Sequence, residues 1–93
     1  MTIRAFRCAD TERLFHGVLV RRFASVSTVA MRKLAMLNAA ERLQDLRVPP
    51  GNRLEALQGD RAGQHSIRVN DQFRVCFRWT DAGPIDVEIC DYH

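Results

Sequence analysis

An alternation of apolar and polar residues over 64–79, QHSIRVNDQFRVCFRW, constrains the fold more than any other stretch of this chain. Ile67 and Val69 occupy every second position before the segment NDQ, and Phe73 begins a second alternating run after it. A period of two is typical of strands that bury one face. Directly opposed residues of an antiparallel pair point to the same side of the sheet. Pairing Val69 with Phe73 therefore predicts a hairpin with a turn at 70–72.

The predicted register has a chemical consequence on the other side of the hairpin. If Val69 faces Phe73, then Arg68 faces Arg74, and opposed like charges destabilise a sheet by roughly 0.2–1 kcal/mol. An anion bound between the two guanidinium groups would relieve that repulsion. Alternatively, both side chains splay into solvent on their long stems, as arginines often do. The hairpin alone does not separate these two possibilities.

A third strand is expected after the turn at 81–84, because apolar residues alternate again from Ile85 onward. Pairing Trp79 with Ile85 keeps the apolar faces together. The opposed pairs on the other face would then be Arg78 with Asp86, Cys76 with Glu88, and Arg74 with Cys90. We therefore expect a carboxylate beside Arg78 and an uncharged neighbour beside Arg74.

The N-terminal half favours helices. Residues 1–8 are a candidate edge strand, and Asp10 is a candidate N-cap for a short helix that runs through His16. Ser25 or Ser27 can cap a main helix over 27–37. Asn38, followed three residues later by a glutamate, resembles the capping box of a second helix over 39–46.

This order of elements predicts an α+β fold, with N-terminal helices packed on one face of a small, mainly antiparallel β-sheet. The face toward the helices would hold Ile67, Val69, Phe73, Val75, Phe77, Val87 and Ile89. The opposite face, expected to be concave and exposed, would hold Arg68, Arg74, Cys76, Arg78, Glu88, Cys90 and Tyr92. At 93 residues, the chain is expected to form a single domain over 1–93.

The charge of the chain suggests a nucleic-acid partner. Its 14 basic residues are all arginine except Lys33, and the net charge is +3. The planar guanidinium fork suits phosphate, although a charge of this size is also common on solvated surfaces. The 3 cysteines lack CxxC spacing, so neither a disulfide framework nor a metal site is expected. With no apolar run of membrane-spanning length and no signal peptide, we expect a cytoplasmic protein.

The last three residues, Asp91-Tyr92-His93, place titratable groups next to the predicted arginine face. A phenol, an imidazole and Arg74 could together deprotonate a ribose 2′-hydroxyl, hold a phosphate and protonate a 5′-oxygen, which RNA cleavage requires. His93 is the natural proton carrier unless the pKa of Tyr92 is perturbed. The plainer alternative is a terminus with no catalytic role, since terminal residues are often disordered and aromatic residues at strand ends usually pack.

The run RLEALQGDRAGQHSIRVNDQFRVCFRW and the terminal VEICDYH resemble the HigB-like branch of the RelE superfamily of toxins, which includes plasmid maintenance killer and GraT toxins. The opening IRAFRCADTERLF is similar to that family's beginning. The resemblance implies a ribosome-dependent endonuclease that cleaves mRNA in the A site, with the 2′-hydroxyl attacking the adjacent phosphate. It also implies an antitoxin of the HigA type, a helix-turn-helix DNA-binding protein, and no cofactor.

Carried over by position, the resemblance assigns Arg74 to the scissile phosphate and Asp91, Tyr92 and His93 to the active-site terminus. Charge and placement make Arg53, Arg61, Arg68 and Arg78 candidate RNA contacts. Gln58 stands where the family commonly has lysine, which removes a cation near the expected RNA path. The alternative function is therefore a non-catalytic or degenerate module that binds RNA, the ribosome or an antitoxin through the same basic face.

Overall fold

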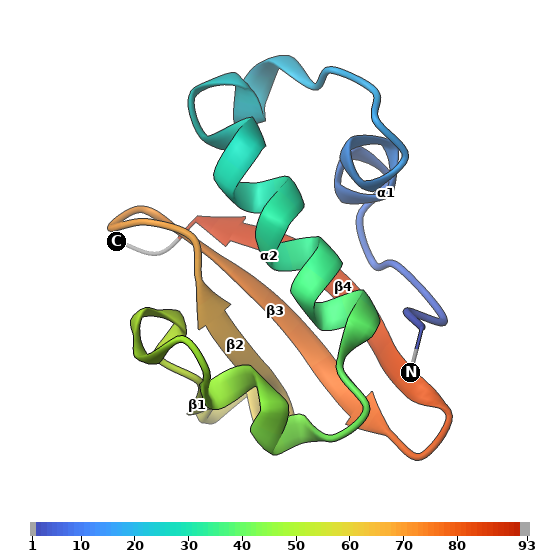
Figure 1. Cartoon of the computed structure of the whole chain (residues 1–93), viewed down its shortest axis with the longest axis vertical. Coiled ribbons are helices and arrows are strands. Elements are labelled where there is room, and N and C mark those ends of the chain that lie inside the picture. Colours follow the sequence, from blue (N-terminus) through green and yellow to red (C-terminus); the bar gives the residue numbers. More distant parts are fainter. Residues whose placement is uncertain (1, 92–93) are drawn as a thin grey trace.

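The computed structural model describes residues 2–91, in which two helices precede a four-stranded sheet (Figure 1). The helices are α1 (Ala9–Phe15) and α2 (Ser27–Ala39), and the strands are β1 (Glu55–Ala56), β2 (His65–Arg68), β3 (Phe73–Thr80) and β4 (Gly83–Asp91). Short 3-10 helices lie at Arg21–Val26, Leu43–Arg47, Pro50–Asn52 and Gly59–Arg61. The predicted α+β class is confirmed.

The sheet is an antiparallel meander with strand order β1-β2-β3-β4. The predicted hairpin register is confirmed, because Arg68 lies opposite Arg74 and the backbone N–H of Val69 donates to the carbonyl of Phe73 at 2.9 Å. The side chain of Asn70 accepts hydrogen bonds from the backbone N–H groups of Gln72 and Phe73. These bonds explain why the polar segment after β2 forms a tight turn.

The predicted register between β3 and β4 holds only near one end of the pair. Arg74 faces Cys90 and Cys76 faces Glu88 as expected. Beyond Cys76 a bulge shifts the pairing, so that Trp79 lies opposite Pro84 and Arg78 opposite Ile85. The predicted Trp79–Ile85 and Arg78–Asp86 pairs are therefore wrong.

The bulge is caused by one additional residue on β4. Asp86 adopts a positive φ of 52°, a left-handed conformation that aspartate tolerates better than most residues. Its carboxylate nevertheless reaches Arg78, with Oδ2 at 3.4 Å from Nε. The expected neutralisation of Arg78 is confirmed, although the two residues are not paired in the ladder.

The helix boundaries differ from the prediction in two places. Helix α1 begins at Ala9, so Asp10 lies within the first turn and is not the N-cap. Its negative charge there interacts favourably with the positive end of the helix dipole. Helix α2 continues through Asn38, whose side-chain oxygen accepts the backbone N–H of Ile3 at 2.9 Å. Asn38 is therefore not a cap, because its side chain is used in a long-range hydrogen bond.

The predicted second helix over 39–46 is also wrong. Ala40 adopts an extended conformation that ends α2, and the following segment forms the short 3-10 helix Leu43–Arg47. The carboxylate of Asp45 accepts the backbone N–H groups of Glu41 and Arg42 at 3.1 and 3.0 Å. Those bonds stabilise a tight local turn where the sequence pattern favoured a continued helix.

The N-terminal segment runs beside β4 without forming a named strand. Its backbone hydrogen bonds include Arg4 N–H to the Pro84 carbonyl at 2.8 Å and Arg7 N–H to the Val87 carbonyl at 3.0 Å. One isolated parallel bridge joins Phe6 to Val87. The segment thus covers part of the β4 edge, which would otherwise offer unpaired backbone groups.

The core lies between the helices and one face of the sheet, as predicted. The seven apolar residues expected on that face are each exposed by 8% or less. They pack with Leu14 of α1 and with Ala30, Leu34 and Leu37 of α2. The hydroxyl of Thr11 accepts the backbone N–H of Ile89 at 3.0 Å, which joins α1 to β4. None of the helices within residues 2–91 has the length and hydropathy of a transmembrane span.

Candidate functional site

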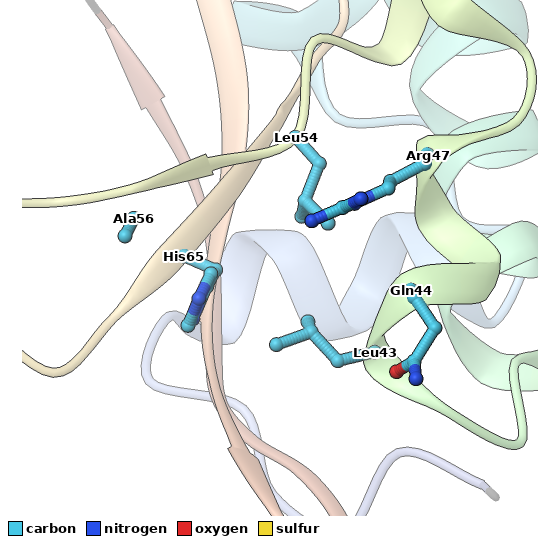
Figure 2. Close-up of a pocket in the computed structure, with 6 residues that line it drawn as sticks. All are labelled: Leu43, Gln44, Arg47, Leu54, Ala56 and His65. Carbon is cyan, nitrogen blue, oxygen red and sulfur yellow. The ribbon is translucent and has the colours of Figure 1, made fainter.

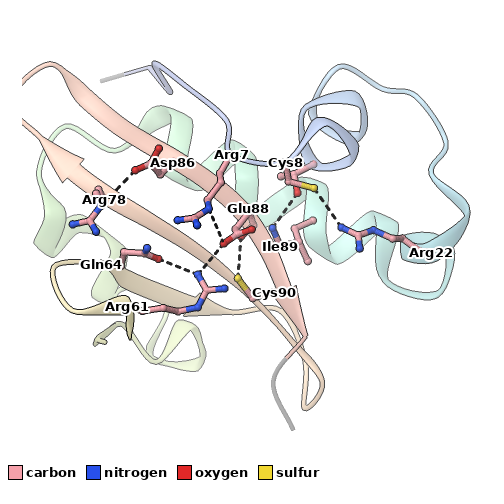
Figure 3. A network of polar contacts seen from close by, with 11 residues as sticks. Arg7, Cys8, Arg22, Arg61, Gln64, Arg78, Asp86, Glu88, Ile89 and Cys90 are labelled. Atoms are coloured by element: carbon pink, nitrogen blue, oxygen red, sulfur yellow. Dashed lines mark hydrogen bonds and ion pairs between the residues drawn. The ribbon is translucent and has the colours of Figure 1, made fainter. Parts of the chain in front are cut away.

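The sheet face that points away from the helices is much less open than the sequence suggests. Arg74 is 8% exposed, Cys76 is 0% exposed and Cys90 is 7% exposed. Part of the cover comes from the 3-10 helix Gly59–Arg61, from which Arg61 reaches over the sheet to Glu88 (Figure 3). The expectation that Arg74 is exposed is therefore wrong, whereas the side chains of Arg68 and Arg78 remain 34% and 40% exposed.

Arg74 is held by three hydrogen bonds to uncharged acceptors. Its Nε donates to Ser66 Oγ at 2.7 Å, and its Nη2 donates to the Arg53 carbonyl at 2.6 Å and the Ser66 carbonyl at 3.4 Å. Arg53 adopts a left-handed φ of 46° at the end of the 3-10 helix Pro50–Asn52. Neutral acceptors satisfy the buried guanidinium without cancelling its positive charge.

One carboxylate approaches Arg74, contrary to the expected uncharged surroundings. Cys90 lies opposite Arg74 as predicted, but Glu55 Oε1 lies 3.9 Å from Nη2. β1 brings Glu55 close to Arg74, since Glu55 is paired with Ser66 across the β1–β2 ladder. Because the Glu55 side chain is 55% exposed and the distance is long, this ion pair is weak.

Arg74 lines a pocket of about 310 Å³ together with two other arginines. The pocket is lined by Arg53, Arg68 and Arg74 together with Glu55, Asn70 and Asp71. We call it the arginine pocket. Arg68 donates to the carboxylate of Asp71, whose side chain is fully exposed. Guanidinium forks complement the oxygens of a phosphate, so the three arginines make this pocket the best candidate site for a phosphodiester.

A larger pocket of about 470 Å³ lies on the other side of β1 (Figure 2). It is lined by Leu43, Gln44, Arg47, Leu54, Ala56 and His65. Of the described residues around it, Arg47 alone carries a guanidinium group. Its greater volume therefore does not make it the better anion site, because three arginines line the arginine pocket across β1.

Arg61 and Arg78, two of the predicted RNA contacts, lie outside the arginine pocket and are bound to carboxylates (Figure 3). Arg61 Nη1 donates to Glu88 Oε1 at 2.8 Å and to the Gln64 side chain at 3.2 Å. The hydrogen bond to Glu88 raises the pKa of Arg61. The structure therefore brings Arg53 and Arg68 to Arg74, but not Arg61 or Arg78.

Asp91 is not among the residues that line the arginine pocket, and its neighbours are not those of Arg74. Asp91 ends β4 opposite Phe73, and its Oδ2 accepts a hydrogen bond from Gln72 Nε2 at 3.1 Å. With Arg22 it lines a separate pocket of about 280 Å³. The other two residues assigned to the active-site terminus, Tyr92 and His93, lie outside the described residues.

Two free thiols sit beneath this face, at Cys76 and Cys90. A hydrogen bond from the Cys90 thiol lowers the pKa of Cys76, and the same bond, together with burial, raises the pKa of Cys90. Among residues 2–91, no three His, Cys, Asp or Glu side chains are grouped closely enough to hold a metal ion. The polar chemistry of the described face therefore comes mainly from guanidinium groups and carboxylates.

Comparison with known proteins shows what the chain is similar to. Residues 6–93 match the family of HigB-like toxins, described as the RelE-like toxin of type II toxin-antitoxin system HigB. Toxin HigB-1 of Vibrio cholerae is 50% identical over 58 residues, which are 62% of this chain and 61% of that protein. An uncharacterized Haemophilus influenzae protein is 45% identical over 51 residues, or 55% of this chain and 50% of that protein.

A solved structure supports the fold independently of close sequence identity. The YoeB/ParE toxin from Agrobacterium tumefaciens has a TM-score of 0.56 to this chain, with coverage of 100% of this chain and 99% of that one. At 18% identity, the likeness concerns the fold, and it confirms the expected RelE-like architecture. Because the family match spans nearly the whole sequence, the chain belongs to the HigB-like family of RelE-like toxins of type II toxin-antitoxin systems.

Proposed function

We propose that this protein is a ribosome-dependent endoribonuclease that cleaves mRNA in the A site and so inhibits translation. Membership of the HigB-like family supports the toxin class. The observation that carries the chemistry is Arg74, whose guanidinium is fixed by neutral acceptors at a pocket shared with Arg53 and Arg68. A cation held in this way can bind a phosphate without first breaking a close ion pair.

In the proposed reaction, the ribose 2′-oxygen attacks the adjacent phosphorus. The 2′-oxygen–phosphorus bond forms as the bond from phosphorus to the 5′-oxygen breaks, leaving a 2′,3′-cyclic phosphate and a free 5′-hydroxyl. Arg74 stabilises the negative charge that grows on the phosphate oxygens, and such pre-positioned donors contribute strongly to catalysis. Arg53 and Arg68 hold the RNA backbone beside it.

The reaction also needs a base for the 2′-hydroxyl proton and an acid for the 5′-oxygen. We assign this proton transfer to the terminal groups Asp91, Tyr92 and His93, as the family resemblance implies. Asp91 accepts a hydrogen bond from Gln72 and lines a pocket with Arg22, so on this proposal it acts once the RNA is brought to it on the ribosome. Arg61 and Arg78 would exchange their carboxylate partners for phosphates.

The proposed setting and partners follow from this activity. Ribosomes and mRNA are cytoplasmic, so we place the protein there. We also propose neutralisation by a HigA-type helix-turn-helix antitoxin, because the family is defined within type II toxin-antitoxin systems. A neighbouring gene for a small helix-turn-helix protein would be the simplest independent support.

One observation favours the alternative, a module that binds RNA or the ribosome without cleaving it. Three of the four candidate RNA contacts, Arg61, Arg68 and Arg78, already have carboxylate partners. Gln58, exposed before the 3-10 helix Gly59–Arg61, supplies no charge where the family commonly has lysine. Both functions would bind phosphate in a salt-sensitive way, so strand scission is the property that separates them.

The test is to induce the wild-type chain in bacterial cells and map mRNA 5′ ends. We expect growth arrest and new 5′ ends inside translated codons. Arg74→Ala should remove both, whereas the matched control Arg13→Ala, an exposed arginine of α1, should keep both. Growth arrest by the wild-type chain without new 5′ ends would support the binding module instead.

The burial of Arg74 requires a folding control for that variant. Replacing it by alanine leaves Ser66 Oγ and the Arg53 carbonyl without their partner, so some loss of stability is expected. Thermal unfolding of purified Arg74→Ala should still show a cooperative transition above the assay temperature. A second variant, truncated after residue 91, should lose mRNA cleavage without altering the Arg74 side chain.

A further inference from the structure

Ser66 does not line the arginine pocket, but its buried side chain contacts Arg74, which does. Ser66 is 0% exposed on β2, where it lies diagonal to Arg74, since Ser66 is paired with Cys76 and Arg68 with Arg74. Its hydroxyl accepts the Nε–H of Arg74 at 2.7 Å. The buried serine therefore contacts the guanidinium directly and is itself shielded from any substrate.

The two shortest hydrogen bonds of Arg74 engage one edge of its guanidinium plane. Nε is bound to Ser66 Oγ, and Nη2 is bound to the Arg53 carbonyl at 2.6 Å. Because the guanidinium is a rigid planar fork, two anchors on different segments determine both its position and its rotation. None of the three hydrogen bonds described for Arg74 uses Nη1.

We propose that Ser66 is a positioning residue for Arg74, which orients the guanidinium toward the scissile phosphate without touching the RNA. This inference rests on the proposed function, because it assumes that Arg74 binds that phosphate. The hydroxyl acts by removing rotational freedom from the guanidinium before the substrate arrives. The backbone carbonyl of Arg53 is the second anchor, and it cannot be removed by changing a side chain.

The kind of anchor matters as much as its position. A carboxylate at position 66 would also accept the Nε–H, but it would neutralise the charge that the phosphate needs. A serine hydroxyl orients the guanidinium while leaving its charge available. Without the hydroxyl, the remaining acceptors, the Arg53 and Ser66 carbonyls, both bind Nη2, so Nε loses its anchor and the fork can rotate about Nη2.

The test uses single-turnover cleavage of A-site mRNA on purified ribosomes. Ser66→Ala should slow cleavage about 10- to 100-fold, since misplacing a catalytic group by about 1 Å can cost 100-fold. The ribosome concentration at half-maximal rate should stay within about twofold, because the remaining RNA contacts are intact. Ser66→Thr, which retains a hydroxyl at the same position, should recover most of the rate.

A double-mutant comparison shows whether Ser66 acts through Arg74. In an Arg74→Lys background the Nε–H is absent, so adding Ser66→Ala should change the residual rate by less than about twofold. A general loss of stability would instead slow both backgrounds equally. Ser27→Ala is the matched control and should cleave normally, because the Ser27 hydroxyl donates to the local Ala24 carbonyl, far along the chain from Arg74.

The outcomes separate this inference from the proposed function. If Arg74→Ala abolishes cleavage but Ser66→Ala cleaves at the wild-type rate, the positioning role is wrong and the nuclease assignment stands. Equal slowing by Ser66→Ala in both backgrounds would likewise overturn the positioning role. If Arg74→Ala itself cleaves like the wild type, the assignment of Arg74 fails, and the role of Ser66 fails with it.

Discussion

Arg68 of β2 lies directly opposite Arg74 of β3, yet the two guanidinium groups have different surroundings. Arg74 turns to the buried Ser66 hydroxyl and the Arg53 carbonyl, whereas Arg68 binds the exposed carboxylate of Asp71. Neither arginine simply splays into solvent. Their repulsion is reduced by hydrogen bonding and by a nearby carboxylate, and both arginines line the arginine pocket, where we propose that a phosphate binds.

Asp71 is expected to compete with RNA for Arg68. Asp71→Asn removes the competing charge and should therefore strengthen binding of a short single-stranded RNA. Each additional phosphate contact should steepen the dependence of log K on log salt by about 0.7. Fluorescence anisotropy between about 50 and 200 mM salt measures both effects. Asp81→Asn, in the exposed β3–β4 turn, is the control for net charge, and an equal gain there would refute a specific role for Asp71.

The core between α2 and the sheet should dominate stability. Leu34 is 0% exposed, so Leu34→Ala should lower the free energy of unfolding by about 2–5 kcal/mol, through lost burial and a cavity. Leu19 is 78% exposed, and Leu19→Ala should change it by less than about 0.5 kcal/mol. Urea unfolding followed by circular dichroism measures both. Similar losses for the two variants would contradict the packing described here.

Asp45 should make a pH-dependent contribution to stability. The backbone N–H groups of Arg42 and Glu41 lower its pKa from the ordinary value of 3.8. A carboxyl whose folded-state pKa is depressed stabilises the fold above its unfolded-state pKa, and the contribution is lost as pH falls through the folded value. Asp45→Ala should therefore be less stable than wild type near neutral pH, and this difference should shrink in acid. A difference that stays constant with pH would exclude the ionised carboxylate as its source.

Cys8 is expected to be the most reactive thiol of the folded protein. Burial opposes its ionisation, but hydrogen bonds from Thr11 and Asp10 and the charge of Arg22 outweigh this effect and lower the pKa of Cys8. Arg22 Nη2 donates to Cys8 Sγ at 3.3 Å. Timed alkylation with iodoacetamide, followed by mass spectrometry, should label Cys8 before the buried Cys76. Arg22→Gln should slow the labelling of Cys8. Faster labelling of Cys76 would show that its burial does not protect it.

The features that sequence predicts best are those governed by periodicity. A period-two pattern determined the hairpin register, including the Arg68–Arg74 pair, and also the buried face of the sheet. Local chemistry was harder to anticipate. The bulge at Asp86 depends on one residue adopting a left-handed conformation, which apolar alternation does not encode. Asn38 remains within α2, and its side chain accepts a hydrogen bond from Ile3, which is distant in sequence.

The candidate site, too, was predictable from the sequence only in part. Its arginines were identifiable from charge and register, but their environment depends on a two-residue edge strand and on the segment folded over the sheet. β1 brings Glu55 toward Arg74, and the Arg53 turn supplies a backbone acceptor. Ser66 gave no sequence signal beyond its parity, since serine is common on strand faces and in turns. Contacts between segments without strong periodicity are therefore what the sequence left open.

The most direct test of the central assignment, that Arg74 stabilises the charge on a cleaved phosphate, is the single-turnover rate of mRNA cleavage on purified ribosomes. Wild type and Arg74→Ala should bind ribosomes with similar affinity. The variant should cleave about 100- to 1,000-fold more slowly, the usual effect of removing one donor to a developing anion. Cleavage by Arg74→Ala at the wild-type rate, or no cleavage by the wild-type protein on ribosomes with mRNA in the A site, would contradict it.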